Sequence, residues 1–347
     1  MSDDRQPGPA GGDRTDEPDL DRGIVEAWAA RMISNPERAY RASFYVATGF
    51  FLVTTLFPFF WLLIVAITPR GDLSDIGVFT PGGTPRAEVT IPLFEWTLAV
   101  PAGIPADVNA AAFVEIFDPS VVPFHWYVFN SFLIATVATV VVLFVASLAG
   151  YVFGRLEFRG RNPLLLLVLI TSFFPPAAFF VPLNRMFNAE LEVLSPLLQD
   201  GSLYNTPYAI FIPLSALYLP LSIFILMTFY AQIPEGLEDA ARVEGTTRLG
   251  ALFRVIVPLS APGVATAGVL TFITVYNEYF FSSLMTDGQA QNWAPMLAGI
   301  LKFQGQYQVL YDLMAAASIV AVLPVTILVI VAQEKIVSGL TAGAVKE

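Results

Sequence analysis

The sequence predicts an all-α integral membrane protein with six transmembrane helices. Hydrophobic residues make up 55% of the 347 residues and charged residues only 14%, a balance that soluble domains rarely show. The apolar residues gather in six runs, each close to the roughly 20 residues that a helix needs to cross a bilayer core of about 30 Å. Lipid offers no partner to backbone polar groups, and the period-2 alternation of a membrane barrel is absent, so the runs are expected to be helical. The six runs span residues 44–67, 130–153, 163–181, 208–230, 263–284 and 313–332.

The first 40 residues are predicted to form a separate N-terminal segment. Residues 1–21 are rich in Asp, Gly and Pro and are expected to be disordered. A short stretch around Trp28 has either of two roles, a helix lying on the membrane surface or a lead-in to the first span. The first apolar run is too long and too far from the N-terminus for a cleavable signal, so it is expected to remain as a helix.

The basic residues predict the orientation of the chain. Segments rich in Lys and Arg tend to stay in the cytoplasm. With the N-terminus inside, fourteen of the eighteen basic residues fall on the cytoplasmic side, and the outer segments hold only Arg70, Arg86, Arg185 and Lys302. The sequence therefore predicts a multi-pass protein of the plasma membrane with both termini in the cytoplasm.

The segments between the runs are unequal in length. Residues 41–337 are predicted to be one transmembrane domain, followed by a cytoplasmic tail at 338–347. The outer loop 69–127 is long enough for a small extracytoplasmic cap, and a second outer loop spans 285–312. On the cytoplasmic side only the loop 231–261 is large.

The first half of this cytoplasmic loop has the pattern of a short helix. Pro234 is followed by acidic residues, which favour the positive N-terminal end of a helix dipole. Ala240, Ala241 and Gly245 supply small side chains, and the last two lie four residues apart on one face. This spacing predicts a face that another surface can approach closely.

The second half of the loop predicts another helix. Thr246 or Thr247 can cap its N-terminus. Pro258 is expected to end it. Its apolar residues recur at three-to-four spacing, namely Leu249, Leu252, Phe253 and Ile256.

These residues resemble the shared loop of permease subunits of binding-protein-dependent ABC importers. That loop reads Glu-Ala-Ala, three residues, Gly, nine residues, then Ile-x-Leu-Pro. The matching positions here are Asp239, Ala240, Ala241, Gly245, Val255, Val257 and Pro258. The departures keep an acid at the helix start and apolar residues before the proline. The resemblance implies a coupling helix that sits in a cleft of an ATPase subunit, with Glu238 and Glu244 beside the motif.

Further segments resemble the carbohydrate-uptake, MalG-like permeases. They are PFFWLLIVAIT at 58–68, NSFLIA at 130–135, FPPAAFFVPL at 174–183 and YNEYFFSSLM at 276–285. The resemblance implies the type I permease fold of ABC importers and a di- or oligosaccharide as the transported sugar. It also implies three partners, namely a MalF-like second permease, a dimer of a MalK-like ATPase, and an extracytoplasmic binding protein that delivers the sugar. The 285–312 loop corresponds to a segment that reaches into the binding protein, although a plain solvated loop is the alternative.

Enzymatic chemistry is poorly represented in the sequence. There is no cysteine, and the single histidine, His125, leaves little basis for a metal site or a catalytic base. No phosphate-binding loop of the G-x-x-x-x-G-K-[ST] type occurs, so ATP and Mg²⁺ are expected on the partner ATPase and no cofactor on this chain. The net charge of −11 argues against nucleic acid.

Polar residues in the fifth run are candidates for the substrate pathway. Tyr276, Asn277, Glu278 and Tyr279 lie where the resembled family borders its pathway, and an ionisable group in a span is costly unless it faces a cavity or a partner. These residues either line the pathway or make a structural hydrogen bond to a neighbouring helix or to the partner permease. An ion-coupled secondary transporter with Glu278 as proton carrier is the alternative function. In the third run, Pro175 and Pro176 are expected to interrupt the helix, beside a cavity or for packing alone.

Overall fold

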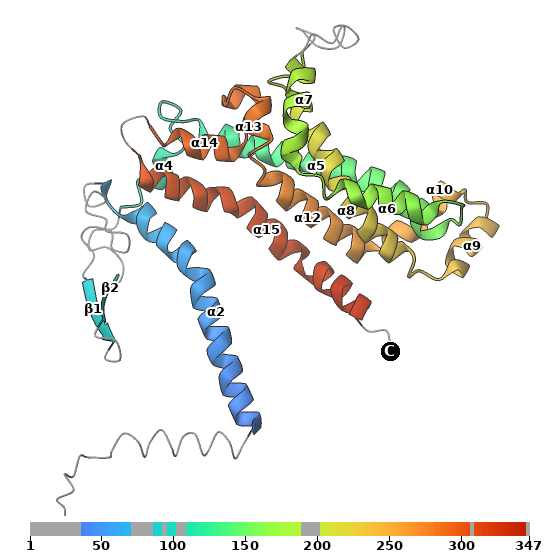
Figure 1. Ribbon diagram of the computed structural model, residues 1–347, viewed down its shortest axis with the longest axis horizontal. Helices are drawn as coiled ribbons and strands as arrows, with labels where there is room; N and C mark the ends of the chain where they lie inside the picture. Colours follow the sequence, from blue (N-terminus) through green and yellow to red (C-terminus); the bar gives the residue numbers. More distant parts are fainter. Residues whose placement is uncertain are drawn as a thin grey trace, which may run out of the picture. The chain divides into compact units, whose positions relative to one another are not determined.

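The computed structural model describes residues 36–70, 86–91, 96–101, 109–188, 202–305 and 309–344. The chain divides into two units after Phe60. The predicted N-terminal features, including the stretch around Trp28, lie outside the described residues. Within those residues, four helices are long and apolar enough to cross a membrane on their own (Figure 1). They are α2 (Pro36–Ile67), α5 (Phe124–Arg155), α8 (Tyr208–Tyr230) and α15 (Tyr311–Ala344).

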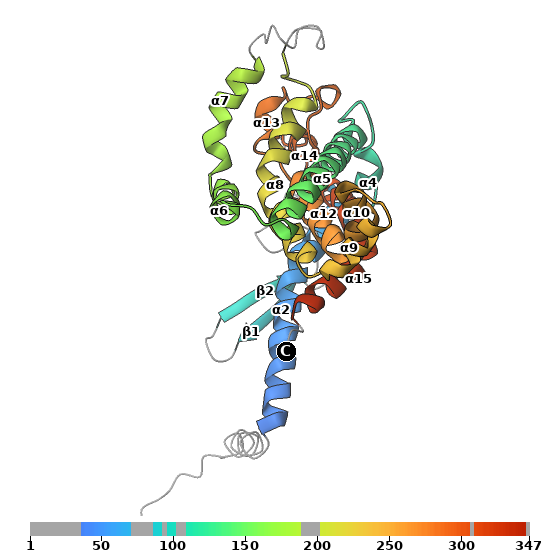
Figure 2. The same ribbon diagram turned by 90° about the vertical axis from the view of Figure 1, so that its right-hand side faces the viewer.

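The third predicted run is not a continuous helix. It consists of α6 (Arg161–Thr171) and α7 (Pro176–Asn188), which meet at 84° (Figure 2). The break follows from Pro175 and Pro176, because proline disfavours helical backbone in the residue before it and fits the first turn of the next helix. The expected interruption is therefore confirmed, and the third run is a pair of helices with a break between them. A cavity of about 460 Å³ lies between these two helices and α8, lined by Thr171, Phe179, Leu183, Met186, Phe187, Ile212, Pro213, Ala216 and Leu217.

The fifth run is also shorter than expected. Helix α12 (Ala261–Tyr276) ends eight residues before the predicted end at residue 284. It is bent by 83° from the preceding helical segment Arg248–Leu259, which comprises α10 (Arg248–Ala251), the π-helix η1 (Leu252–Ile256) and α11 (Val257–Leu259). If each bent pair counts as one span, the described residues hold six spans.

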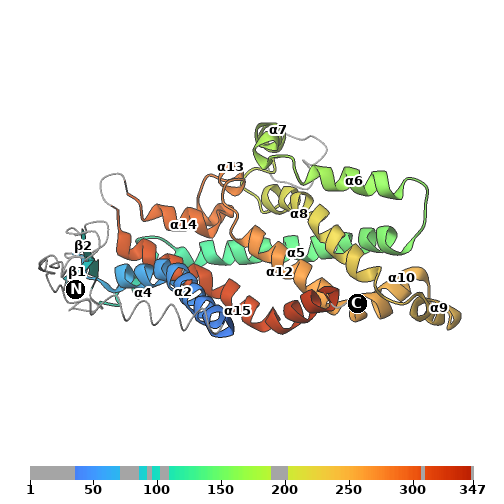
Figure 3. The same ribbon diagram turned by 60° about the horizontal axis from the view of Figure 1, so that its bottom comes forward.

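The second unit has a core in which α5, α8, α12 and α15 pack along one another (Figures 1 and 3). Small residues permit the closest approach. A Cβ added at Gly150 of α5 would lie 3.1 Å from the backbone nitrogen of Met227 in α8, and one at Gly154 would lie 3.0 Å from the Met227 carbonyl oxygen. Such close contact between apolar helices replaces the hydrophobic driving force that lipid cannot supply.

The segments predicted as outer loops contain regular structure. The 69–127 segment includes an antiparallel hairpin of β1 (Arg86–Ile91) and β2 (Trp96–Pro101), an addition to the all-α architecture, and a short helix α4 (Ala112–Glu115).

The 285–312 segment is likewise structured. It follows α13 (Ser282–Met285) and contains η2 (Ala290–Asn292) and α14 (Met296–Lys302). Asn130 of α5 donates from Nδ2 to the carbonyl oxygens of Ala290 at 2.7 Å and Ala294 at 3.1 Å. These contacts exclude a plain solvated loop for that part of the chain.

The predicted C-terminal tail begins as helix. Helix α15 continues to Ala344, so residues 338–344 are helical, whereas the candidate membrane span within α15 is Tyr311–Glu334. Residues 345–347 lie outside the described part of the chain.

Candidate functional site

The short helix predicted in the loop 231–261 is α9 (Glu235–Val243). Pro234 precedes it with an extended ψ of 134°, Glu235 and Glu238 lie in its first turn, and Arg242 lies in its last turn. Acids at the start and a base at the end both interact favourably with the helix dipole. The local sequence therefore accounts for this helix, as expected.

Gly245 ends α9 by its backbone conformation. Its φ of +92° is in the left-handed region, which glycine adopts without strain. The N–H of Gly245 donates to the Arg242 carbonyl at 3.0 Å, and the N–H of Thr246 donates to the Ala241 carbonyl at 3.1 Å. These two bonds form a Schellman motif, which satisfies carbonyls at the helix end. The interpretation of Gly245 as part of a close-contact helix face was therefore wrong, because it lies beyond the helix.

The second predicted helix begins as expected and ends differently. The Thr247 side chain accepts a hydrogen bond from the N–H of Gly250 at 3.1 Å and so caps α10. Pro258 does not end the helical segment, which continues to Leu259. The wider π-helical turn before the proline relieves the clash that its ring makes in a regular helix. Of the four apolar residues in the predicted pattern, Leu252 and Ile256 are buried, whereas Leu249 and Phe253 are exposed.

Glu238 is buried against the end of α5. Its Oε1 accepts a hydrogen bond from the Tyr151 hydroxyl at 2.6 Å, and its Oε2 accepts one from Arg155 Nε at 3.0 Å. Arg155 also donates from Nη1 to the carbonyl of Ile233 at 2.6 Å. The Arg155 and Glu238 side chains are only 5% and 10% exposed. Glu238 therefore faces its own chain, unlike the exposed residues beside it on α9.

The remainder of the predicted docking site is mostly open to solvent. Asp239 approaches Arg242 at 3.5 Å in an ion pair in which both side chains are largely exposed. Apolar side chains also stand free on α9, with Val243 89% exposed and Leu237 46%. Exposed members of the site are Asp239, Ala240, Glu244, Gly245 and Pro258, and half-buried members are Ala241, Val255 and Val257.

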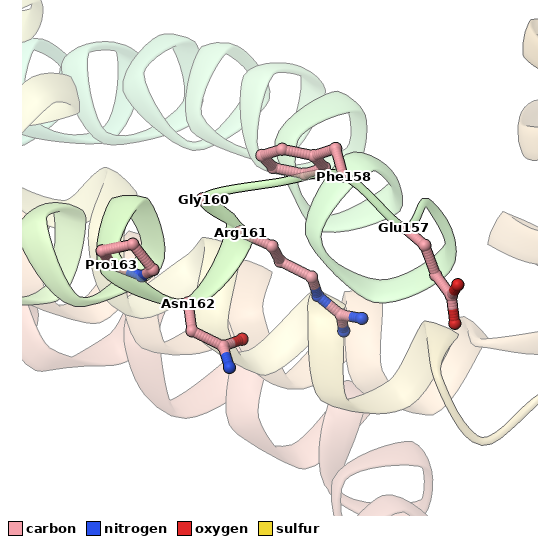
Figure 4. A pocket seen from close by; sticks show the side chains of 6 residues that line it. All are labelled: Glu157, Phe158, Gly160, Arg161, Asn162 and Pro163. Carbon is pink, nitrogen blue, oxygen red and sulfur yellow. The ribbon is translucent and has the colours of Figure 1, made fainter.

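The link between α5 and α6 lies at the same end of the bundle as α9 (Figures 1 and 3). It surrounds a shallow cavity of about 350 Å³ that is lined by Glu157, Phe158, Gly160, Arg161, Asn162 and Pro163 (Figure 4). Pockets for small molecules are usually deep and mostly apolar. This polar, surface cavity therefore lacks the character of a small-molecule site.

The predicted pathway residues separate into buried and accessible positions. Tyr276 is fully buried, its hydroxyl donates to the Ala321 carbonyl at 2.8 Å, and its ring stacks on Phe272. It is therefore a packing residue, which corrects its assignment to the pathway. Asn277 is exposed at the C-terminus of α12, and Tyr279 is half-buried beyond it. For these two, a place on the pathway stays a prediction.

Glu278 lies in the turn after α12 and not within a helix. Its carboxylate accepts hydrogen bonds from the N–H groups of Phe281 and Ser282 and from the Ser282 hydroxyl. The first N–H groups of a helix have no partner inside it, so this carboxylate caps α13. The structural role is thus local, instead of a bond to a distant helix.

Sequence reasoning missed Tyr151 and Arg155. They lie four residues apart near the end of α5 and therefore on one face. The available sequence signal was a tyrosine and an arginine at this spacing, at a position where a span meets a loop.

Comparison with solved structures supports the fold. The chain aligns with a chain from the crystal structure of a bacterial ABC transporter that imports the acidic polysaccharide alginate, with a TM-score of 0.58 and 18% sequence identity. The alignment covers 93% of this chain and 99% of that chain.

Comparison with curated proteins and family models identifies the family. The chain is 32% identical over 302 residues to the sulfoquinovosyl glycerol transport system permease protein SmoH of Agrobacterium fabrum, which covers 87% of this chain and 93% of that protein. It is 30% identical over 295 residues to the trehalose/maltose transport system permease protein MalG of Thermococcus litoralis, covering 85% and 92%. Residues 146–341, which include α9, match the family model of the inner membrane component of binding-protein-dependent transport systems. Membership excludes the ion-coupled carrier that uses Glu278, and this chain belongs to the family of inner membrane components of binding-protein-dependent transport systems.

Proposed function

We propose that this chain is one permease half of an ATP-driven importer for a di- or oligosaccharide or a related glycoside. The main support for the proposal is that the relatives which match most of this chain are named as permeases for sugars or a related glycoside. SmoH is named for sulfoquinovosyl glycerol, and MalG of Thermococcus litoralis for trehalose and maltose. Each covers more than four fifths of this chain, so the likeness includes the spans as well as the loop.

The exposed side of α9 supports its role as the coupling helix. Among the described residues, the apolar side chains of Leu237 and Val243 on α9 stay exposed, as expected of a surface that another subunit covers. The exposed carboxylate of Asp239 beside them can pair with a basic group of an ATPase. ATP binding and hydrolysis then belong to a MalK-like dimer, and a MalF-like permease supplies the other half of the pore.

The orientation follows from the same assignment. An ATPase partner acts in the cytoplasm, so the end of the bundle that carries α9 and the α5–α6 link is the cytoplasmic end. Both termini then lie in the cytoplasm, and the hairpin, α13 and α14 belong to outer segments that face the binding protein. Residues 41–337 form the permease domain, with residues 1–40 and 338–347 as its cytoplasmic extensions.

Reconstitution tests this function. The chain is purified with its second permease and ATPase, inserted into proteoliposomes, and supplied with the binding protein and radiolabelled trehalose, maltose or arabino-oligosaccharides. We expect uptake of at least one probe that requires both ATP and the binding protein. Uptake without the ATPase, or no uptake of any probe, would contradict the proposal.

A charge reversal tests the coupling surface. Asp239→Lys places a cation opposite the basic group that the ATPase is expected to present. The two like charges repel, so binding of the ATPase should weaken by about 10-fold or more. Glu157→Lys is the matched control, because Glu157 is an exposed acid at the same end of the bundle. Co-purification of the ATPase measures the effect. Equal retention of the ATPase by both variants would remove Asp239 from the interface.

A further inference from the structure

Glu238 is the single buried side chain of α9, all nine residues of which the structure describes. The other side chains of this helix are exposed or half-buried. The two hydrogen bonds that Glu238 accepts from Tyr151 and Arg155 are therefore the principal polar link between α9 and α5. Both donors lie in the last five residues of α5.

Arg155 holds the start of α9 at a second point. Its Nε binds the Glu238 carboxylate, while its Nη1 binds the carbonyl of Ile233, just before Pro234 and the helix. One guanidinium thus fixes both the turn after α8 and the first turn of α9. Lysine has a single ammonium group and does not reproduce this two-sided geometry.

Stability alone is a weak reason for such an arrangement. Removing two charged groups from water is costly, and well-packed apolar residues are often equally stable in place of a buried ion pair. Arg155 Nη2 is buried and has no hydrogen-bond partner among the described residues, so the pair is not even fully satisfied. What the pair does provide is one fixed orientation of α9 relative to α5.

The location of the pair makes this orientation relevant to transport. Helix α5 crosses the bundle and packs against α8, α12 and α14. Its far end is bound to the outer 285–312 segment through Asn130. A displacement of α9 that moves α5 is therefore passed along the whole length of the bundle.

We propose that Tyr151 and Arg155 are positioning residues which fasten α9 to α5 through Glu238, so that movement of α9 by the ATPase moves α5. The proposal rests on the proposed function of α9 as the coupling helix. The surface that meets the ATPase and the attachment that transmits its motion are then formed by adjacent residues, Asp239 and Glu238, which point in different directions.

The test measures sugar imported per ATP hydrolysed by the complete importer in proteoliposomes. Tyr151→Phe and Glu238→Gln each remove one part of the link with little change in volume. We expect the ratio of import to hydrolysis to fall by about 2-fold to 30-fold, while the amount of ATPase bound to the complex stays unchanged. Because the two residues act through one contact, Tyr151→Phe/Glu238→Gln should lower the ratio no further than the more severe single variant. Arg155→Lys should also lower the ratio of import to hydrolysis, because lysine does not reproduce the two-sided geometry of the guanidinium.

Matched controls separate a coupling role from a folding role. Tyr208→Phe changes an exposed tyrosine at the start of α8, and Glu157→Gln changes an exposed acid in the α5–α6 link. Both should keep the wild-type ratio. An unchanged ratio in Tyr151→Phe and Glu238→Gln, or a loss that only follows a reduced yield of complex, overturns the attachment while leaving the importer intact. A wild-type complex that imports no probe overturns both proposals.

Discussion

At the scale of single residues, Gly245 shows how one position can be read in two ways. Its small size suggested a close-contact surface, whereas its φ of +92° is that of a residue that ends a helix. The space around the position of an added Cβ is open. The two interpretations predict opposite orders of substitution, because asparagine is larger than alanine but adopts left-handed backbone more readily.

We therefore expect Gly245→Asn to retain more transport than Gly245→Ala. Alanine at a left-handed position costs about 1 kcal/mol, which would loosen the end of α9. Uptake rates of the two variants, measured at equal expression, decide the matter. If alanine is tolerated better than asparagine, size at the interface matters more than backbone conformation.

Arg70 is the centre of a second ionic contact, at the opposite end of the bundle. Its Nε donates to Asp312 at the start of α15, and its Nη2 donates to Glu115 of α4, both at 2.7 Å. Burial lowers the pKa of the guanidinium, but the hydrogen bonds to Glu115 and Asp312 outweigh this effect, and the pKa is raised above its ordinary value. Since the raised pKa keeps Arg70 charged as pH rises, its contribution persists throughout the usual range of pH.

Arg70→Met should destabilise the protein by about 1–3 kcal/mol. The Asp312 side chain is only 8% exposed, and its Oδ1 already has no partner among the described residues, so loss of Arg70 leaves a buried carboxylate unpaired. Thermal unfolding in detergent measures the change. Arg41→Met is the control, because the Arg41–Glu37 pair is widely exposed and should contribute less than about 0.5 kcal/mol. Equal shifts for the two variants would show that the buried partner is unimportant.

At the scale of elements, the contact of α5 with α8 depends on glycine. A Cβ at Gly150 meets the Met227 backbone nitrogen at 3.1 Å, whereas a Cβ at Gly268 in α12 meets the end of the Leu143 side chain at 3.2 Å. Backbone cannot move without shifting its helix, but the tip of a leucine can rotate away.

The distances are nearly equal and the neighbours differ, so the two substitutions form a matched pair. We expect Gly150→Ala to destabilise the protein by about 1–3 kcal/mol through overpacking. Gly268→Ala should be neutral or stabilising by up to about 1 kcal/mol, because alanine favours helix. Unfolding by denaturant or heat in detergent gives both values. A larger loss at Gly268 would mean that α12 is the less adjustable neighbour.

Elements with strong local signals were predictable from the sequence. Length and hydropathy were enough for α5, α8 and α15, and the acids and Thr247 were enough for α9 and α10. Departures arose where another interaction determined the backbone. Glu278 caps α13 and so ends the fifth span early, and the π-helix carries the chain through Pro258. The partner of Glu238 was not predictable, because Arg155 lies 83 residues away and local patterns do not specify tertiary pairing.

At the scale of the whole molecule, the alternation of spans places α9 and the 285–312 segment at opposite ends of the bundle (Figure 3). The absence of cysteine from the sequence makes this arrangement directly measurable, since every introduced thiol is unique. Val243 and Gln291 are exposed positions at the two ends.

We expect Gln291→Cys to react with a membrane-impermeant maleimide in cells whose cytoplasmic membrane is intact. Val243→Cys should react only after the membrane is permeabilised, because the excess of basic residues predicts that its side faces the cytoplasm. The extent of labelling on a gel provides the measurement, and the unmodified cysteine-free chain is the blank. The reverse pattern would invert the orientation and remove α9 from reach of an ATPase.

The bend at Ser260 also has a mechanical consequence. The segment Arg248–Leu259 and helix α12 meet at 83°, so together they form an L with its corner at one residue. At 1.5 Å per residue the short arm is about 18 Å long and the long arm about 24 Å. A rigid rotation about Ser260 that displaced the tip of the short arm would displace the tip of the long arm about one third further.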